Sequence, residues 1–152
     1  MNMKVYFTGT LFRKDCMQKL KAEDYQKMIE TFENQGAKVL TKNAIDVLYA
    51  IRNEHIKSTE ANERDTNWLK ECDIVFADIT IPDFVIGCNL GYAESLGKKI
   101  YAVYEKGTNI YSETDTSIFD FIRQKKNVQL FAYKNIRDVL KKISDICRDF
   151  NN

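Results

Sequence analysis

The chain has 152 residues, of which 44% are hydrophobic and 30% are charged, so it has the size and apolar content of one globular domain. Its 23 lysines and arginines nearly balance its 22 aspartates and glutamates, which argues against a protein that binds nucleic acid through a basic face. No apolar run approaches the roughly 18 residues that a membrane span requires, and the N-terminus has no signal-peptide pattern, so we expect a cytoplasmic protein.

Hydrophobic periodicity predicts strands that alternate with helices. In chain order we expect a strand at 3–9, a helix at 24–36, a strand at 37–41, a weak helix at 43–55, a helix at 58–73, a strand at 73–80, a helix at 89–97, a strand at 98–105, a loop at 106–117, a short helix at 117–124, a strand at 127–133 and a helix at 135–150. This order indicates one α/β domain over residues 1–152, with a flavodoxin- or Rossmann-like doubly wound sheet of about five mostly parallel strands.

The four cysteines are widely scattered, and none of them forms a CxxC pair. The only histidine, His55, has no cysteine neighbour at ligand spacing, so the sequence predicts reduced thiols and no zinc site. A nucleophilic pair of cysteine and histidine would require the fold to bring His55 against a thiol.

Ligands bind at the carboxyl edge of an open parallel sheet, and two predicted loops at that edge hold most of the polar groups. The first is "TGTLFRK" (8–14), where backbone N–H groups near Gly9 and Thr10 could hold a phosphate or a sugar hydroxyl. Because it has one glycine rather than a glycine-rich run, an ordinary strand-to-helix turn explains it equally well. The second loop is "TIPDFVIGCN" (80–89).

Three aspartates are candidates for chemistry at this edge. Asp65 precedes Trp68 by three residues, and we expect it to project towards the carboxyl edge of the sheet, although a solvated surface aspartate is the plain alternative. Asp78 lies near the end of the predicted strand, where a helix N-terminus could stabilise it, and Asp83 lies in the loop that follows. Two carboxylates at a sheet edge could orient a polyhydroxylated ligand or act as acid and base. On spacing alone, a role as turn formers or helix caps is the simpler explanation.

Two segments, "KVYFTGTLF" (4–12) and "RDTNWLKECDIVFADITIPDFVIGCNLGYAESLGKKIYAVY" (64–104), together resemble the nucleoside 2-deoxyribosyltransferases and their relatives, the 2′-deoxynucleoside 5′-phosphate N-hydrolases. The features that carry the resemblance are the tyrosine and glycine of the first strand and loop, Asp65 before "WL", and the "LGYA" helix after a glycine turn. The resemblance implies cleavage or transfer of an N-glycosidic bond, with no metal or cofactor. It also implies a glutamate that attacks the anomeric carbon, and an acidic residue that positions the sugar or protonates the leaving base.

The resemblance assigns roles to individual residues of this chain. Tyr6 and Gly9 match the first-loop positions, Asp65 matches the acidic helix position, and Asp83 matches the polar position six residues before the nucleophile. The other residues that we expect to contact the substrate are Thr10, Asp78, Gly87 and Ser117, of which Ser117 resembles a serine that the hydrolases contribute from the neighbouring subunit.

The chain departs from the family pattern at the nucleophile itself. That position is Asn89, and an amide is neither a usable nucleophile nor a base, although it can form hydrogen bonds with a sugar hydroxyl. Glu94, five residues further on, is rotated well away on a helix. In the first loop, the position of the hydrolases' phosphate-binding arginine is Phe12, with Arg13 beside it.

Two functional hypotheses therefore stay open. The first is an enzyme that cleaves the N-glycosidic bond with another carboxylate, Asp83 or Asp78, or by a dissociative path in which Asn89 orients water. The second is a nucleoside- or nucleotide-binding protein that has lost turnover. An unrelated flavodoxin-like binding domain is a third reading, which requires the "LGYA" match to be accidental.

The resemblance also implies the partners of the chain. We expect a nucleoside or nucleotide as its small-molecule ligand, no nucleic acid polymer and no membrane. We expect a homodimer or a higher homo-oligomer, because family pockets are completed across a subunit interface, with the contact at residues 109–121 and 128–133.

Overall fold

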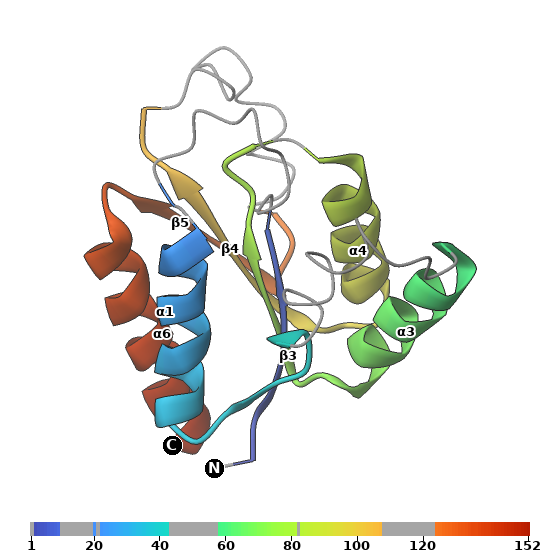
Figure 1. Ribbon diagram of the computed structural model, residues 1–152, viewed down its shortest axis with the longest axis horizontal. Coiled ribbons are helices and arrows are strands. Elements are labelled where there is room, and N and C mark those ends of the chain that lie inside the picture. The colour runs from blue at the N-terminus through green and yellow to red at the C-terminus, as the bar shows by residue number, and fades with distance from the viewer. Residues whose placement is uncertain (1, 10–19, 21, 43–57, 82, 108–123) are drawn as a thin grey trace.

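The computed structural model describes residues 2–9, 20, 22–42, 58–81, 83–107 and 124–152, which form a parallel sheet between two layers of helices (Figure 1). The strands are β1 (Lys4–Thr8), β2 (Lys38–Val39), β3 (Ile74–Asp78), β4 (Lys99–Glu105) and β5 (Val128–Tyr133). The helices are α1 (Ala22–Asn34), α3 (Ser58–Glu71), α4 (Phe84–Ser95) and α6 (Ile136–Asn151). All strand pairs are parallel and their order is β2-β1-β3-β4-β5, which confirms the predicted α/β class. No helix in these ranges is long and apolar enough to cross a membrane.

The strand order fixes where a ligand can bind. The chain leaves β1 towards β2 on one side and continues from β3 towards β4 on the other, so the order reverses between β1 and β3. In open parallel sheets the loops diverge at such a switch point and leave a crevice at the carboxyl ends of the strands. A ligand crevice is therefore expected at the carboxyl ends of β1 and β3.

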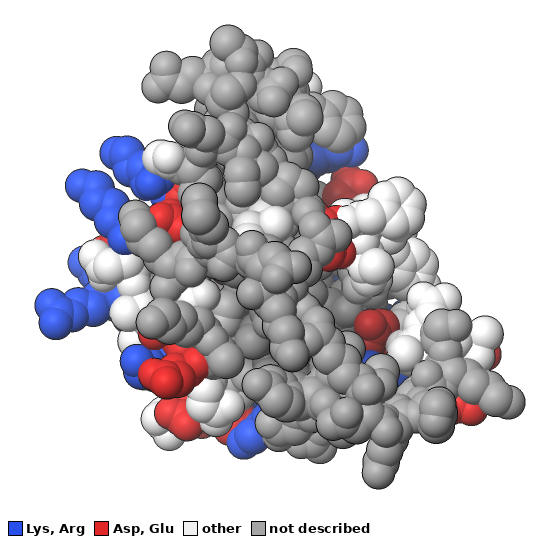
Figure 2. All heavy atoms as spheres, turned by 45° about the horizontal axis from the view of Figure 1, so that its top comes forward, with Lys and Arg blue, Asp and Glu red and all other residues white. Residues whose placement is uncertain are grey.

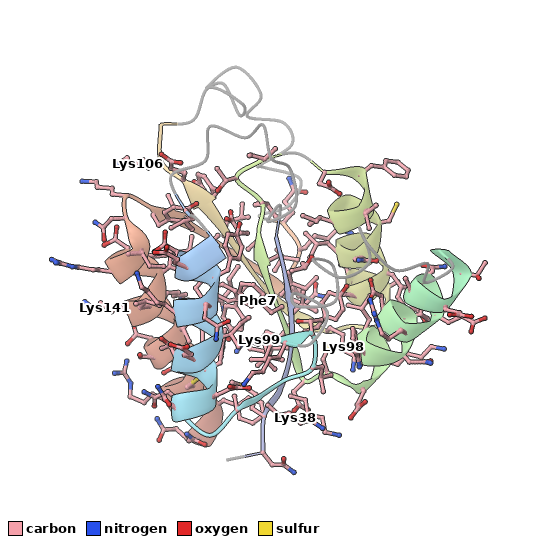
Figure 3. The ribbon with its side chains drawn as sticks, viewed as in Figure 1. Phe7, Lys38, Lys98, Lys99, Lys106 and Lys141 are labelled. Atoms are coloured by element: carbon pink, nitrogen blue, oxygen red, sulfur yellow. The ribbon has the colours of Figure 1, made fainter. Side chains whose placement is uncertain are left out.

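Alternation of side chains along β1 and β3 sends neighbouring residues to opposite faces of the sheet. Val5 and Phe7 belong to the core beneath α1 and α6, whereas Tyr6 belongs to the core beneath α3 and α4. On the α1–α6 face, Phe7 stacks on Phe76 with ring centroids 5.8 Å apart, and Figure 3 places Phe7 between the sheet and α1.

A network of buried polar groups closes the carboxyl edge of the α1–α6 face. The Tyr25 hydroxyl donates to Asp78 Oδ2 (2.5 Å), and the hydroxyl and amide of Thr80 both donate to Asp78 Oδ1 (2.6 and 3.0 Å). The Thr80 hydroxyl also lies 2.8 Å from that of Tyr133. Gly9 leaves room for this network, since a Cβ at that position would lie 2.6 Å from Cε1 of Tyr25.

The predicted helix at 89–97 begins five residues earlier than expected, at Phe84. The cause is Asp83, whose Oδ1 accepts hydrogen bonds from the amides of Val85 (2.8 Å) and Ile86 (3.1 Å) and so caps the helix. The prediction of a glycine turn before the helix is therefore wrong, because Gly87 lies inside α4. The other predicted elements agree with the structure to within about two residues at each end, except the helices at 43–55 and 117–124 and most of the 106–117 loop, which lie outside the described residues.

Lys98 connects the last residues of α3 to the start of β4. Its ammonium group donates to the carbonyl oxygens of Lys70 (2.8 Å) and Cys72 (2.7 Å), which satisfies groups that a helix end leaves without partners (Figure 3). These two bonds join the C-terminal end of α3 to the residue that precedes β4.

The buried network predicts a stability effect. We expect Tyr25→Phe to lower the free energy of unfolding by about 1.5–3 kcal/mol, since it removes a hydrogen bond to a buried carboxylate. Urea denaturation measures the change. Tyr92→Phe is the matched control, because the Tyr92 side chain is only half-buried, and we expect it to stay within about 0.5 kcal/mol of the wild type. Equal losses in the two variants would contradict the role given to Tyr25.

Candidate active site

Four polar side chains gather between the sheet and the α3–α4 layer, near the switch point. Tyr6 comes from β1, Arg64 and Asp65 from α3, and Asn89 from α4 (Figure 1). Below them lies an apolar floor that consists of Leu40, Leu69, Cys72, Val75, Ala93 and Ile100. We call the four polar residues, Tyr6, Arg64, Asp65 and Asn89, the Tyr6 cluster.

A hydrogen bond between side chains links β1 to α4. Asn89 Nδ2 donates to the Tyr6 hydroxyl oxygen over 3.0 Å, between residues 83 positions apart in the sequence. The amide oxygen of Asn89 receives no hydrogen bond within the described part of the chain, and the side chain is half-buried. An acceptor oxygen is therefore available to a ligand hydroxyl or a water molecule, at the position where the family resemblance places a carboxylate.

Asp65 and Arg64 form an ion pair at the edge of this cluster. Arg64 Nη2 lies 3.3 Å from Asp65 Oδ1, and 27% of each side chain is exposed. Burial raises the pKa of the Asp65 carboxyl, while the charge and hydrogen bond of Arg64 lower it in part. A carboxyl with a raised pKa is a better proton donor near neutral pH than an ordinary aspartate.

The Tyr6 hydroxyl lies within the electric field of both charged side chains. Burial raises the pKa of Tyr6, the negative charge of Asp65 raises it further, and the positive charge of Arg64 opposes the rise. Tyr6 therefore keeps its proton, accepts a hydrogen bond from Asn89 and can still donate one. The raised pKa thus disfavours the phenolate form that a nucleophile would need.

The other two aspartates lie apart from the Tyr6 cluster. Asp78 is fully buried and points to the α1–α6 face, where Tyr25 and Thr80 bind it, so the sheet separates it from Asn89. Asp83 is the N-cap of α4, one of the two explanations that spacing favoured. Contacts of these aspartates with a substrate stay predictions.

The remaining predicted site residues divide into two groups. Gly9 lies against the Tyr25 ring, and Gly87 lies on the exposed side of α4, where a Cβ would meet nothing within 4 Å. Thr10 and Ser117 lie outside the described residues, and so do Phe12, Arg13 and His55. Their predicted roles therefore stay untested.

Sequence reasoning missed Arg64. In the structure the guanidinium carbon of Arg64 lies 4.6 Å from the centroid of the Trp68 ring, which is a cation–π contact. Two signals in the sequence pointed to it: arginine and tryptophan four residues apart on a helix face one another, and Arg64 directly precedes Asp65.

The thiol beneath the cluster and the possible metal ligands of the described residues can each be assessed. Burial raises the pKa of Cys72, the cysteine beneath the cluster, to about 11, so it stays a protonated thiol near neutral pH. Among the described residues, no three histidine, cysteine, aspartate or glutamate side chains lie close enough to hold a metal ion.

Comparisons with known proteins show which family and which fold the chain resembles. Residues 5–142 match the family described as Nucleoside 2-deoxyribosyltransferase. The 5-hydroxymethyl-dUMP N-hydrolase of Mus musculus is 32% identical over 102 residues, which are 66% of this chain and 56% of the mouse protein. The match thus spans little more than half the length of that relative.

Two solved structures share the fold. The CMP N-glycosidase BcmB of Clostridium botulinum superposes with a TM-score of 0.66 at 20% sequence identity, covering 94% of this chain and 98% of its own. BlsM superposes with a TM-score of 0.73 at 19% identity, covering 98% of this chain and 94% of its own.

The raised pKa of Asp65 predicts that this residue reduces stability at neutral pH. A carboxyl with a higher pKa in the folded state binds its proton more tightly there, so stability falls as pH rises from its unfolded pKa, about 3.9, through its folded pKa. We expect Asp65→Asn to raise the free energy of unfolding at pH 7, by at most about 1 kcal/mol because the site is partly exposed. Urea denaturation at pH 7 and near pH 3.5 measures the gain, which should shrink at the lower pH.

The control for this prediction is Glu63→Gln, the same carboxylate-to-amide change at an exposed position of α3. It should change stability little at either pH. A gain from Asp65→Asn that does not depend on pH, or a loss at pH 7, would show that burial does not control this carboxyl.

Proposed function

Since this chain belongs to the nucleoside 2-deoxyribosyltransferase family, we propose that it binds a nucleoside or nucleoside monophosphate at the Tyr6 cluster and cleaves its N-glycosidic bond with water. The observation that carries the proposal is the hydrogen bond from Asn89 to Tyr6. The resemblance implies that residue 89 is the nucleophile position, and the bond joins the neutral amide of Asn89 to the tyrosine that the resemblance also assigns to the site. These features support a retained ligand site with a changed reaction path.

Without a carboxylate at position 89, the sugar cannot be held as an ester of the protein. Water attacks the anomeric carbon directly: a bond forms between the water oxygen and C1′, and the bond from C1′ to the base nitrogen breaks. The electron pair of that bond stays on the base. Asp65, in its protonated form, gives its proton to the base, and the proton released by water passes to solvent, from which Asp65 is protonated again. The Asn89 amide oxygen orients the water or a sugar hydroxyl.

Two consequences follow from this path. Transfer of the sugar to a second base needs an intermediate that persists while the bases exchange, so we expect hydrolysis rather than transfer. The reaction is also slow, because removal of a covalent nucleophile costs several orders of magnitude in rate in enzymes that rely on one.

We propose a monophosphate as the first substrate to test. The mouse relative is named for a deoxynucleoside monophosphate, and the superposed glycosidase is named for CMP. The residues of the first loop that would contact a phosphate lie outside the described ranges.

A second candidate is a nucleotide-binding protein without turnover. It is favoured by the same amide, together with the positions of the other two aspartates. Asp78 is enclosed on the far face of the sheet, and Asp83 is engaged as a helix cap, so neither is an evident replacement for the missing carboxylate.

Restoring the carboxylate distinguishes these candidates. We expect the wild type to release free base slowly from a deoxynucleoside monophosphate, with no exchange onto an added acceptor base. We expect Asn89→Glu to release base on the order of a hundredfold faster and to form a covalent sugar adduct. Base release is measured by chromatography and the adduct by intact-protein mass. Asn89→Gln is the control, since it lengthens the side chain but keeps the amide.

Each other outcome decides against a part of the proposal. Base exchange or an adduct in the wild type contradicts direct attack by water. Tight binding without base release selects the binding protein. If the wild type binds no nucleoside or nucleotide, and Asn89→Glu releases no base, both candidates fail.

We also propose that the chain forms a homodimer through the outer face of α4. Phe84 is 86% exposed, Val85 62% and Leu96 40%, and no charged residue occurs between Phe84 and Ala93. Figure 2 shows uncharged side chains on the flank where α4 lies, with acidic side chains beside them, whereas the opposite flank carries many charged side chains of both signs. A helix that is apolar on all sides is normally covered, and an uncharged patch suits a two-fold interface because it must meet its own copy. This surface differs from the contact that we predicted at 109–121 and 128–133.

Phe84→Glu tests the dimer. We expect the wild type to be dimeric at micromolar concentration and Phe84→Glu to be monomeric, because the interface would bring two carboxylates against apolar surface. Light scattering coupled to gel filtration measures the mass. Phe150→Glu, at a residue of α6 that is 46% exposed, is the matched control and should stay dimeric. A monomeric wild type would refute the dimer.

A further inference from the structure

The two carboxyl oxygens of Asp65 have different surroundings. Arg64 Nη2 donates to Oδ1 over 3.3 Å, whereas Oδ2 receives no hydrogen bond within the described part of the chain. In those ranges Arg64 Nε is the one buried side-chain nitrogen or oxygen without a partner, so Oδ2 of Asp65, which also has none, is not a buried atom. Oδ2 is therefore the carboxyl oxygen that a ligand can reach.

The guanidinium group that binds Oδ1 is itself fixed by packing. Its carbon lies 4.6 Å from the centroid of the Trp68 ring, its Nε is buried, and Trp68 packs against the apolar floor of the cluster. A guanidinium group is planar and keeps its charge throughout the physiological range, and its donors point in fixed directions. Arg64 thus holds Asp65 in one orientation rather than pairing with it as a mobile surface ion.

This contact determines which oxygen of Asp65 can carry a proton to a ligand. The carbonyl oxygen of a carboxylic acid accepts hydrogen bonds better than its hydroxyl oxygen, so the guanidinium keeps Oδ1 as the carbonyl and leaves the proton on Oδ2. In the proposed reaction the bond from Oδ2 to hydrogen breaks and the proton goes to the leaving base. The electron pair stays on the carboxylate, where the charge of Arg64 stabilises it.

We propose that Arg64 is a positioning residue of the proposed hydrolysis, which holds Asp65 by Oδ1 so that Oδ2 gives the proton to the leaving base. The inference rests on the proposed function and adds the donating atom and the residue that orients it. Two other groups face Asp65: Tyr6 from β1, which burial keeps protonated, and Asn89 from α4, which is neutral. Arg64 is therefore the cation of the cluster, and it opposes the rise in the pKa of Asp65 that burial causes.

The test is the pH dependence of base release from a mixture of the four common deoxynucleoside monophosphates. The rate falls as pH rises, because the acid form of Asp65 is lost. Arg64→Met removes the charge that favours the carboxylate, so we expect the falling limb to move to higher pH by about one unit. We also expect the limiting rate at low pH to drop about tenfold, because Oδ2 is no longer held in place.

Two variants separate orientation from an unspecific structural effect. Arg64→Lys keeps the charge but not the fork of donors, so its falling limb should stay near that of the wild type while its limiting rate drops. Arg148→Met is the matched control, since Arg148 also pairs with an aspartate of its own helix but lies in the last turn of α6, and it should change neither quantity. Arg64→Gln replaces Arg64→Met if the latter does not fold.

A carbon-13 NMR titration of the Asp65 carboxyl group, assigned by its loss in Asp65→Asn, gives a readout that does not depend on activity. We expect its midpoint to be higher in Arg64→Met than in the wild type and unchanged in Arg148→Met. Base release by the wild type, with a falling limb or an Asp65 midpoint that Arg64→Met does not move, overturns this inference alone. A wild type that releases no base removes the proposed function and this inference with it.

Discussion

The alternation of side chains along β1 and β3 is the constraint on which the rest of this structure depends. Because successive residues of a strand point to opposite faces, Tyr6 and Phe7 enter two different cores. The same rule separates Asp78, which faces α1 and α6, from the Tyr6 cluster beneath α3 and α4. The carboxyl edge of the sheet thus has two polar regions, one closed by Tyr25 and Thr80 and one that leaves an amide oxygen available.

The two regions have different physical roles. The Asp78 network satisfies its oxygens with hydroxyl and amide donors from the protein itself, and a buried network of this kind stabilises the packing of α1 on the sheet. The Tyr6 cluster instead combines a carboxyl of raised pKa, a guanidinium with an unpaired N–H and an amide. Unpaired donors and acceptors reduce stability, and proteins retain them mainly where a ligand completes them.

Asn89 is a neutral amide at the position where the family resemblance implies a carboxylate, and this difference affects the charge of the cluster as well as its chemistry. A glutamate beside Tyr6 would bring a second negative charge close to Asp65. With an amide in its place, Asp65 and Arg64 are the charged members of the cluster, and they balance one another. In the proposed function, this charge balance would spare an anionic nucleotide the repulsion of a second carboxylate.

The sequence by itself determined the α/β class, the order of the main strands and helices, the family and the position of the amide at residue 89. These properties follow from periodicity and from motifs whose members lie within a few residues of one another. The start of α4 escaped prediction, because a cap at Asp83 outweighed the glycine at 87. Only the tertiary structure decided that Asn89 meets Tyr6, that Asp78 turns away from both, and that Arg64 lies on Trp68 with an unpaired Nε. The physical reason is that strand order and register set contacts between residues as distant as 83 positions, and no local pattern encodes the register of a parallel sheet.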